Sequence, residues 1–193
     1  MINGKMMVTT AEEKETEAVG EILGSLIKEP QVITLDGDLG AGKTVLVRGA
    51  ARGLEAEGRV RSPTFNLLQV YRGKLPVYHF DFYRMEEEEE LLELGLEEYL
   101  EGDGVVFIEW GHRFPAFLPE ERLEICLERS NPQYEKLEAG EVEEIEKEYR
   151  MIHFTPRGFC HNRLIEVFWE AMHYDRFGKI CGKINRPEKQ GGS

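Results

Sequence analysis

The chain has 193 residues, of which 41% are hydrophobic and 32% charged, as is typical of a single globular domain. Its formal net charge of −13 argues against a broad electrostatic grip on nucleic acid, which requires clustered lysines and arginines. No apolar run approaches the roughly 20 residues of a membrane span, and no signal segment opens the chain. Three scattered cysteines favour reduced thiols over a disulfide framework. We therefore expect a cytoplasmic protein without membrane contacts.

The first predicted elements are a helix and a buried strand. Residues 11–28 place apolar side chains on one face of an amphipathic helix, with Thr10 as the N-cap and Glu13 completing a capping box. Residues 31–36 contain the short β-branched run Val-Ile-Thr-Leu, which favours a fully buried strand. A glycine-rich loop follows, and a second helix is expected over residues 44–56.

The middle of the chain alternates between strands and a helix. Aromatic and branched residues at 65–70 and 75–82 predict an antiparallel hairpin. A leucine-rich helix is expected over 86–100, with five consecutive glutamates at its start, where carboxylates favour the positive helix end. Buried strands are expected at 105–108 and 122–127.

The last third is more irregular. Residues 129–149 are highly charged and are interpreted as an exposed insertion, with a charged helix in the second half. An edge strand at 150–155 and a helix at 160–172 follow. We expect one domain over 1–172 and a basic, flexible tail over 173–193.

A phosphate-binding motif lies between the first buried strand and the second helix. Residues 37–44 match Gly-x-x-x-x-Gly-Lys-Thr, whose glycines let successive backbone amides face an anion. The helix start adds further amides and its positive end. Lys43 can reach the β- and γ-phosphates of ATP, and the Thr44 hydroxyl can bind Mg²⁺. The nucleotide-binding candidates here are Asp38, Leu39, Gly40, Ala41, Gly42, Lys43 and Thr44.

Two acids end buried strands, as a second magnesium ligand requires. Glu109 closes the run Val-Val-Phe-Ile, and Asp81 closes Val-Tyr-His-Phe. In a parallel sheet both would face the phosphates, since ligands lie beyond the carboxyl ends of the strands. We assign Glu109 to the metal and Asp81 to the attacking water or an outer contact, although the two roles can be exchanged. Alternatively, either acid caps the next helix. The pattern predicts a P-loop NTPase-like α/β fold with a mostly parallel sheet, an antiparallel hairpin and flanking helices.

Other residues near the motif have two readings each. Thr64 can sense the γ-phosphate from a switch-like loop, or Pro63 fixes a purely structural turn there. Trp110 either covers the nucleotide or packs in the core. His79 is interpreted as a packing residue on a strand, with a catalytic role as the alternative.

Five motifs together resemble the TsaE (YjeE) family of bacterial P-loop ATPases. The resemblance runs from about Thr10 to Glu124. In the order of the family, the motifs are Thr16-Glu17-Ala18-Val19-Gly20, the loop at 37–44, Ser62-Pro63-Thr64-Phe65, His79-Phe80-Asp81-Phe82-Tyr83-Arg84 and Ile108-Glu109-Trp110.

This resemblance implies a function that composition does not reveal. Members assist synthesis of the threonylcarbamoyl group on adenosine 37 of tRNAs that read codons starting with A. They are ATPases that join the TsaB–TsaD pair, so tRNA is reached indirectly through that complex. The resemblance implies that Lys43 and Thr44 bind phosphate and magnesium, that Glu109 is the second magnesium position, and that Asp81 is essential for hydrolysis. It also places Thr10 and Thr16 near the nucleotide.

Other functions use the same loop. A small-molecule kinase is the main alternative, but the hairpin and acidic helix stand where such kinases usually carry an arginine-rich lid. A GTP-dependent switch is disfavoured because the chain lacks an Asn-Lys-x-Asp segment.

Overall fold

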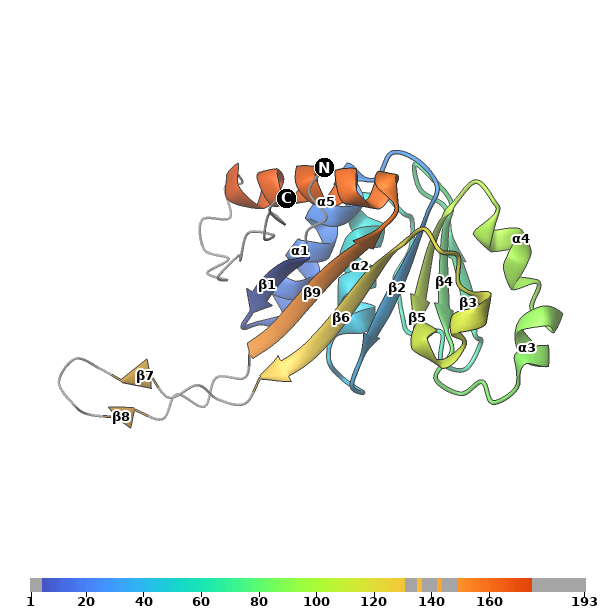
Figure 1. Ribbon diagram of the computed structural model, residues 1–193, viewed down its shortest axis with the longest axis horizontal. Coiled ribbons are helices and arrows are strands. Elements are labelled where there is room, and N and C mark those ends of the chain that lie inside the picture. Colours follow the sequence, from blue (N-terminus) through green and yellow to red (C-terminus); the bar gives the residue numbers. More distant parts are fainter. Residues whose placement is uncertain (1–4, 131–134, 137–141, 144–148, 175–193) are drawn as a thin grey trace, which may run out of the picture.

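A computed structural model describes residues 5–130, 135–136, 142–143 and 149–174. These residues form a seven-stranded sheet flanked by helices (Figure 1). The strands are β1 (Met6–Thr10), β2 (Gln31–Gly37), β3 (Leu68–Tyr71), β4 (Val77–Asp81), β5 (Val105–Glu109), β6 (Arg122–Ser130) and β9 (Tyr149–Arg157). The helices are α1 (Glu13–Leu26), α2 (Lys43–Gly53), α3 (Glu88–Glu93), α4 (Leu96–Leu100) and α5 (Phe159–Tyr174). Two short 3-10 turns follow β5, at Gly111–Arg113 and Pro115–Phe117.

The centre of the sheet is parallel and its sides are antiparallel. The strand order is β1-β9-β6-β2-β5-β4-β3. Strand β2 pairs in parallel with β5 and β6, and β4 pairs in parallel with β5. Strands β3, β9 and β1 each join antiparallel. This arrangement confirms the predicted fold class and the predicted hairpin.

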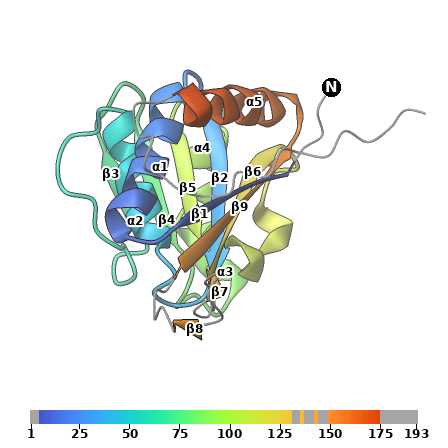
Figure 2. The ribbon, with the colours of Figure 1, turned by 90° about the vertical axis from the view of Figure 1, so that its left-hand side faces the viewer.

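Side chains alternate between two cores along the central strands. Ile33, Val105 and Phe107 point to the core shared with α1, α2 and α5, while Val32 and Val106 point to a second core beneath α3 and α4. Figures 1 and 2 both show α1 and α2 lying together on one face. Alternation has a period of two in strands. Residues on β4 and β5 with the parity of Phe107 therefore face the layer of α2.

Three expected features differ in the structure. The helix expected over 86–100 is broken into α3 and α4 at Gly95, whose φ of 66° lies in the left-handed region. The strand expected at 150–155 is not an edge strand, because β1 pairs along its outer side. Because β1 takes up the residues through Thr10, helix α1 has Glu12 rather than Thr10 as its N-cap, and Glu15 completes the capping box.

The expected insertion is shorter than predicted at both ends. Strand β6 continues to Ser130, and β9 begins at Tyr149. Between them, β7 (Glu135–Lys136) and β8 (Val142–Glu143) pair antiparallel, so the expected charged helix is wrong at Val142 and Glu143. The rest of 131–148 lies outside the described residues. So does the predicted tail, apart from the end of α5.

Glycines bring α1 and α2 into backbone contact. A methyl group built on Gly20 of α1 would lie 2.2 Å from the Leu46 carbonyl oxygen, and one built on Gly24 would lie 2.0 Å from the Ala50 carbonyl oxygen. One built on Gly49 of α2 would lie 1.9 Å from the Glu17 carbonyl oxygen. These separations are below any van der Waals contact, so the crossing requires glycine.

The Gly49→Ala variant tests this contact, because helix propensity and packing predict opposite changes in the free energy of unfolding. Alanine is the better helix former by about 1 kcal/mol, which alone would stabilise α2. Because the added methyl group forces α1 and α2 apart, we expect a net loss of about 1–3 kcal/mol in the free energy of unfolding, measured in urea. Glu97→Ala on exposed α4 should change it by less than about 0.5 kcal/mol. A gain in stability for Gly49→Ala would contradict the packing.

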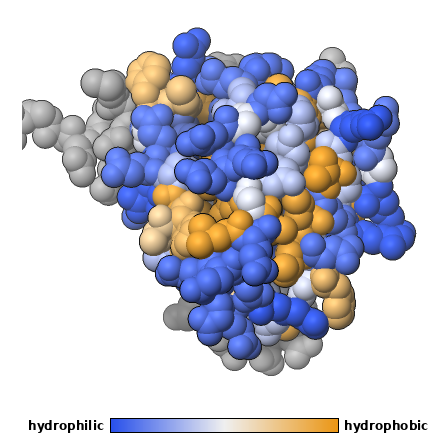
Figure 3. Space-filling model, turned by 90° about the vertical axis from the view of Figure 1, so that its right-hand side faces the viewer, coloured by the Kyte–Doolittle hydropathy of each residue, from blue (hydrophilic) through white to orange (hydrophobic). Residues whose placement is uncertain are grey.

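The second core is only partly covered. Figure 3 shows the side on which α3 and α4 lie, where apolar side chains gather between charged ones. A hollow of about 470 Å³ is lined by leucines of α3 and α4 together with Ala116 and Phe117, and Leu92 is 67% exposed. None of the helices within the described residues has the length and apolar composition to cross a membrane.

Candidate nucleotide-binding site

The loop between β2 and α2 is shaped to hold phosphate groups. Gly37, Gly40 and Gly42 have φ values of 129°, 76° and 108°, which residues with a Cβ rarely adopt. The first bond of α2 runs from the Leu46 amide to the Gly42 carbonyl, 3.0 Å away. The amides at the start of α2 therefore precede the helical ladder and remain available to an anion.

Lys43 lies inside this loop. Its ammonium donates to the carbonyls of Gly37 and Asp38, at 2.7 and 2.9 Å, and lies 3.9 Å from the ring centroid of Trp110. The residue is only 4% exposed, and burial lowers the pKa of Lys43, an effect that the nearby carboxylates of Glu109 and Asp81 oppose. A phosphate group entering the loop would replace these carbonyls as the acceptor for the ammonium and would favour its charged form.

Glu109 ends β5 directly opposite the start of α2. Its Oε1 accepts hydrogen bonds from the Thr44 hydroxyl at 2.7 Å and from the Nε2 of His79 at 2.9 Å. Within the described residues no hydrogen bond ends on Oε2 of this carboxylate. The loop, the helix and the central strand thus meet at one carboxylate oxygen.

Asp81 ends β4, next to Glu109 in register. Its Oδ2 accepts from the Ser62 hydroxyl at 3.0 Å and from the Thr64 hydroxyl at 2.5 Å. Its Oδ1 accepts from the Tyr83 amide at 3.0 Å. Asp81 therefore fixes the loop at residues 61–64 to the sheet and does not cap a helix.

Most of the predicted binding residues share one hollow of about 290 Å³. Its walls include Leu39, Gly40, Gly42, Lys43, Thr44, Thr64, Asp81, Glu109 and Trp110, all of which were predicted from the sequence, and also Val45, Ser62 and Tyr83. Trp110 has a left-handed φ of 63°, and its ring lies 5.1 Å from that of Tyr83.

Four predicted residues do not line this hollow. Asp38 contributes its carbonyl to Lys43, and Ala41 is fully buried. Thr10 and Thr16 are also buried, and their hydroxyls bond to each other at 2.7 Å. The Thr16 methyl group lies beneath Gly42, 3.7 Å from a Cβ built there. In this arrangement Thr16 packs against the loop and Thr10 holds its hydroxyl, and the contact of either threonine with a nucleotide stays a prediction.

Two arginines beside the loop were missed by the sequence analysis. Arg129 of β6 donates to the Gly40 carbonyl at 2.7 Å, and the side chain of Arg150 on β9 passes over Gly42. The two arginines are partners in the antiparallel register. They lie on the β6 side of β2, whereas Glu109 lies on the β5 side. No local sequence signal reveals them, because a strand pairing over 20 residues apart brings them together.

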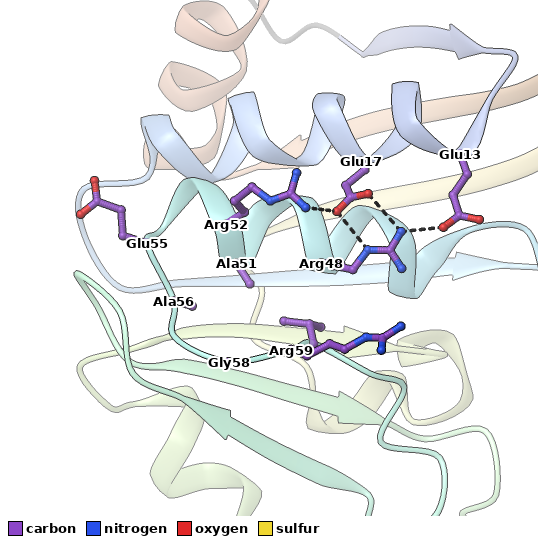
Figure 4. A pocket seen from close by; sticks show the side chains of 10 residues that line it. Glu13, Glu17, Arg48, Ala51, Arg52, Glu55, Ala56, Gly58 and Arg59 are labelled. Atoms are coloured by element: carbon purple, nitrogen blue, oxygen red, sulfur yellow. Dashed lines mark hydrogen bonds and ion pairs between the residues drawn. The ribbon is translucent and has the colours of Figure 1, made fainter.

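A larger hollow of about 690 Å³ lies away from the loop (Figure 4). Its charged walls neutralise one another, because Arg48 bonds to Glu13 and Glu17, and Arg52 bonds to Glu17 and Glu21. The hydrogen bond from Arg48 is the main reason that the pKa of Glu17 is lowered. These ion pairs tie α1 to α2, and none of the residues of the glycine-rich loop, 37–44, lines this hollow.

The oxygen ligands present at the site fit a magnesium ion bound together with phosphates. Thr44 and Glu109 offer hard oxygen atoms within 2.7 Å of each other, and Oε2 of Glu109 faces no protein donor among the described residues. Among the residues that the structure describes, no group of three or more His, Cys, Asp or Glu side chains could hold a metal ion by itself. A magnesium ion here would depend on phosphate oxygens, as it does in phosphoryl-transfer sites generally.

A buried strand, a glycine-rich loop ending in Lys-Thr, and an acid on the adjacent parallel strand together define a P-loop nucleotide-binding protein of the α/β class. Residues 10–137 match the family described as "Threonylcarbamoyl adenosine biosynthesis protein TsaE". The chain belongs to the TsaE family.

Individual relatives agree with this assignment. A Bacillus subtilis protein named tRNA threonylcarbamoyladenosine biosynthesis protein TsaE is 46% identical over 122 residues, covering 63% of this chain and 76% of the relative. A Treponema pallidum protein of the same name is 41% identical over 122 residues, covering 63% and 90%. The crystal structure of Bacillus subtilis YdiB superimposes with a TM-score of 0.69 at 33% identity, covering 87% of this chain and 96% of YdiB.

Proposed function

We propose that this protein binds and hydrolyses ATP as a cytoplasmic subunit of the machinery that makes threonylcarbamoyladenosine in tRNA. The observation that carries the proposal is the meeting of Lys43, Thr44 and Glu109 at the mouth of the glycine-rich loop. The names of the relatives supply the pathway. A small-molecule kinase is not favoured, because the relatives reported above are named for the tRNA modification.

Each residue has a role in this proposal. The loop amides and Lys43 bind the β- and γ-phosphates, while Thr44 and Glu109 hold Mg²⁺, which neutralises phosphate charge when bound. Asp81 orients the attacking water, or the loop that covers it through Ser62 and Thr64. Trp110 and Thr64 close the site around the terminal phosphate. Arg129 and Arg150 lie on the opposite side of β2, beside Gly40 and Gly42 of the loop, where they add positive charge next to the phosphates.

The partner in this proposal is the TsaB–TsaD pair, which the family resemblance implies. The net charge of −13 argues against a broad electrostatic grip on tRNA. We therefore propose that tRNA is reached through the partners and that hydrolysis depends on them.

The decisive experiment measures ATP hydrolysis with and without the TsaB–TsaD pair of the same organism, together with threonylcarbamoyladenosine formed in tRNA. With tRNA and an activated threonylcarbamoyl donor supplied in every reaction, we expect hydrolysis to rise with the partners. Modified tRNA should accumulate over many turnovers only when all three proteins and ATP are present as well. Every lost ATP should appear as ADP and inorganic phosphate. Hydrolysis that ignores the partners and needs an added metabolite, which becomes phosphorylated, would overturn the proposal.

A further inference from the structure

We propose that His79 is a positioning residue that holds Glu109 in place for magnesium. The inference deepens the proposed function and rests on it, because it concerns the metal-linked acid of the same site. His79 lies on β4 and is 0% exposed, and its Nε2 is 2.9 Å from Oε1 of Glu109, which is 3% exposed. The interaction joins two neighbouring parallel strands beneath the P-loop.

The register of the sheet brings these side chains together. His79 is paired with Phe107, and Asp81 with Glu109, so all four residues share the parity that faces the layer of α2. Glu109 is the next residue after Phe107 on the same face of β5, two positions along the chain. The His79 ring extends along the sheet to reach it. The histidine therefore supports the carboxylate from the sheet side, while Thr44 approaches it from the helix side.

Hydrogen-bond chemistry fixes the direction of this interaction. An ionised carboxylate only accepts, so the proton lies on Nε2 of His79 and points at Oε1. Two donors on Oε1 restrain the rotation of the Glu109 carboxylate and would leave Oε2 available to a magnesium site. This is the usual arrangement by which an outer hydrogen bond orients a metal-linked side chain.

Packing alone does not account for a histidine here. Its Nδ1 is buried and has no hydrogen-bond partner among the described residues. An unsatisfied buried polar atom costs about 1–3 kcal/mol, whereas an apolar side chain of similar volume would fill the space without that cost. The structure thus keeps a polar ring at a stability penalty, and its one hydrogen bond goes to Glu109.

The test compares His79→Leu with His79→Gln in the full chain. Leucine fills the space without a donor. Glutamine places its amide nitrogen the same number of bonds from Cα as Nε2 and can still donate to Glu109. The readout is the affinity for a fluorescent ADP analogue, measured in excess Mg²⁺ and in EDTA. Urea unfolding of each variant is measured in parallel.

We expect Mg²⁺ to strengthen ADP binding by the wild-type protein and His79→Leu to reduce this strengthening by about 10-fold or more. Affinity in EDTA should change little, because the loop and Lys43 are intact. His79→Leu should unfold at the same urea concentration as the wild type or a higher one, and His79→Gln should recover most of the Mg²⁺ effect.

Two results would overturn the inference. One is a Mg²⁺ effect that His79→Leu leaves intact. The other is an equal loss in His79→Gln and His79→Leu together with lowered stability, which would indicate a structural role. If the wild-type protein itself bound no ADP, the proposed function would fail instead, so the two failures are distinguishable.

Discussion

Replacing Lys43 with alanine is expected to lower ATP hydrolysis by the partner-activated protein by about 10²–10³-fold, the loss typical when one preorganised donor to a developing charge is removed. The ammonium is held inside the loop by the carbonyls of Gly37 and Asp38, so it already occupies the place that the phosphates reach. ATP affinity should fall as well, because the proposed function has Lys43 contact the phosphates both before and during hydrolysis. Steady-state hydrolysis and titration with a fluorescent ATP analogue measure the two effects.

Lys28→Ala is the matched control for this variant. Lys28 is exposed just beyond α1, where its ammonium donates to the Ser25 carbonyl, so the same charge is removed far from the loop. Its hydrolysis should stay within about twofold of the wild-type rate. If Lys43→Ala hydrolysed ATP as fast as Lys28→Ala, the loop could not be the phosphate site.

Glu109→Gln is expected to lower hydrolysis by about 10²–10³-fold, because several kcal/mol of charge stabilisation depends on a correctly held metal ion. The substitution preserves size and leaves an oxygen that can accept from Thr44 and His79, so the lost charge is the main change. The Mg²⁺-dependent part of nucleotide affinity should fall together with the rate. Hydrolysis over a range of Mg²⁺ concentrations and nucleotide titration with and without EDTA measure this.

Asp81→Asn separates the roles of the two acids. Asp81 accepts hydrogen bonds from Ser62, Thr64 and the Tyr83 amide, so its loss should disturb the loop at residues 61–64 and the rate. The Mg²⁺-dependent affinity should be retained in Asp81→Asn and lost in Glu109→Gln. The reverse pattern would exchange the roles and place Asp81 at the metal. Glu97→Gln on exposed α4 repeats the chemical change and should leave both readouts unaltered.

The parts of the site that were predictable depend on short-range patterns. The eight residues of the loop are contiguous, and their glycines indicate the positions where the backbone takes a positive φ. Glu109 and Asp81 were predictable because each ends an apolar run, and parallel strands bring such ends to one edge.

The rest depends on geometry that a single sequence does not contain. Arg129 and Arg150 meet only because β6 and β9 pair, and the intervening charged stretch gives no sign of it. The outer position of β1 was missed because five residues alternating in burial carry little pattern. The break between α3 and α4 depends on one glycine in a leucine-rich stretch that is otherwise typical of a continuous helix.

The pairing of β1 with β9 delays completion of the sheet while the chain is being synthesised. Among the described strands β1 pairs only with β9, and about 150 residues separate Met6 from Arg157. At roughly 5–20 residues per second, a ribosome takes about 8–30 s to add them. During that time the first strand has no partner, and the outer edge of β6 is open as well. The sheet is therefore completed only after the last strand leaves the exit tunnel, and a nascent chain stalled before it carries two exposed edges, which chaperones recognise and which promote aggregation.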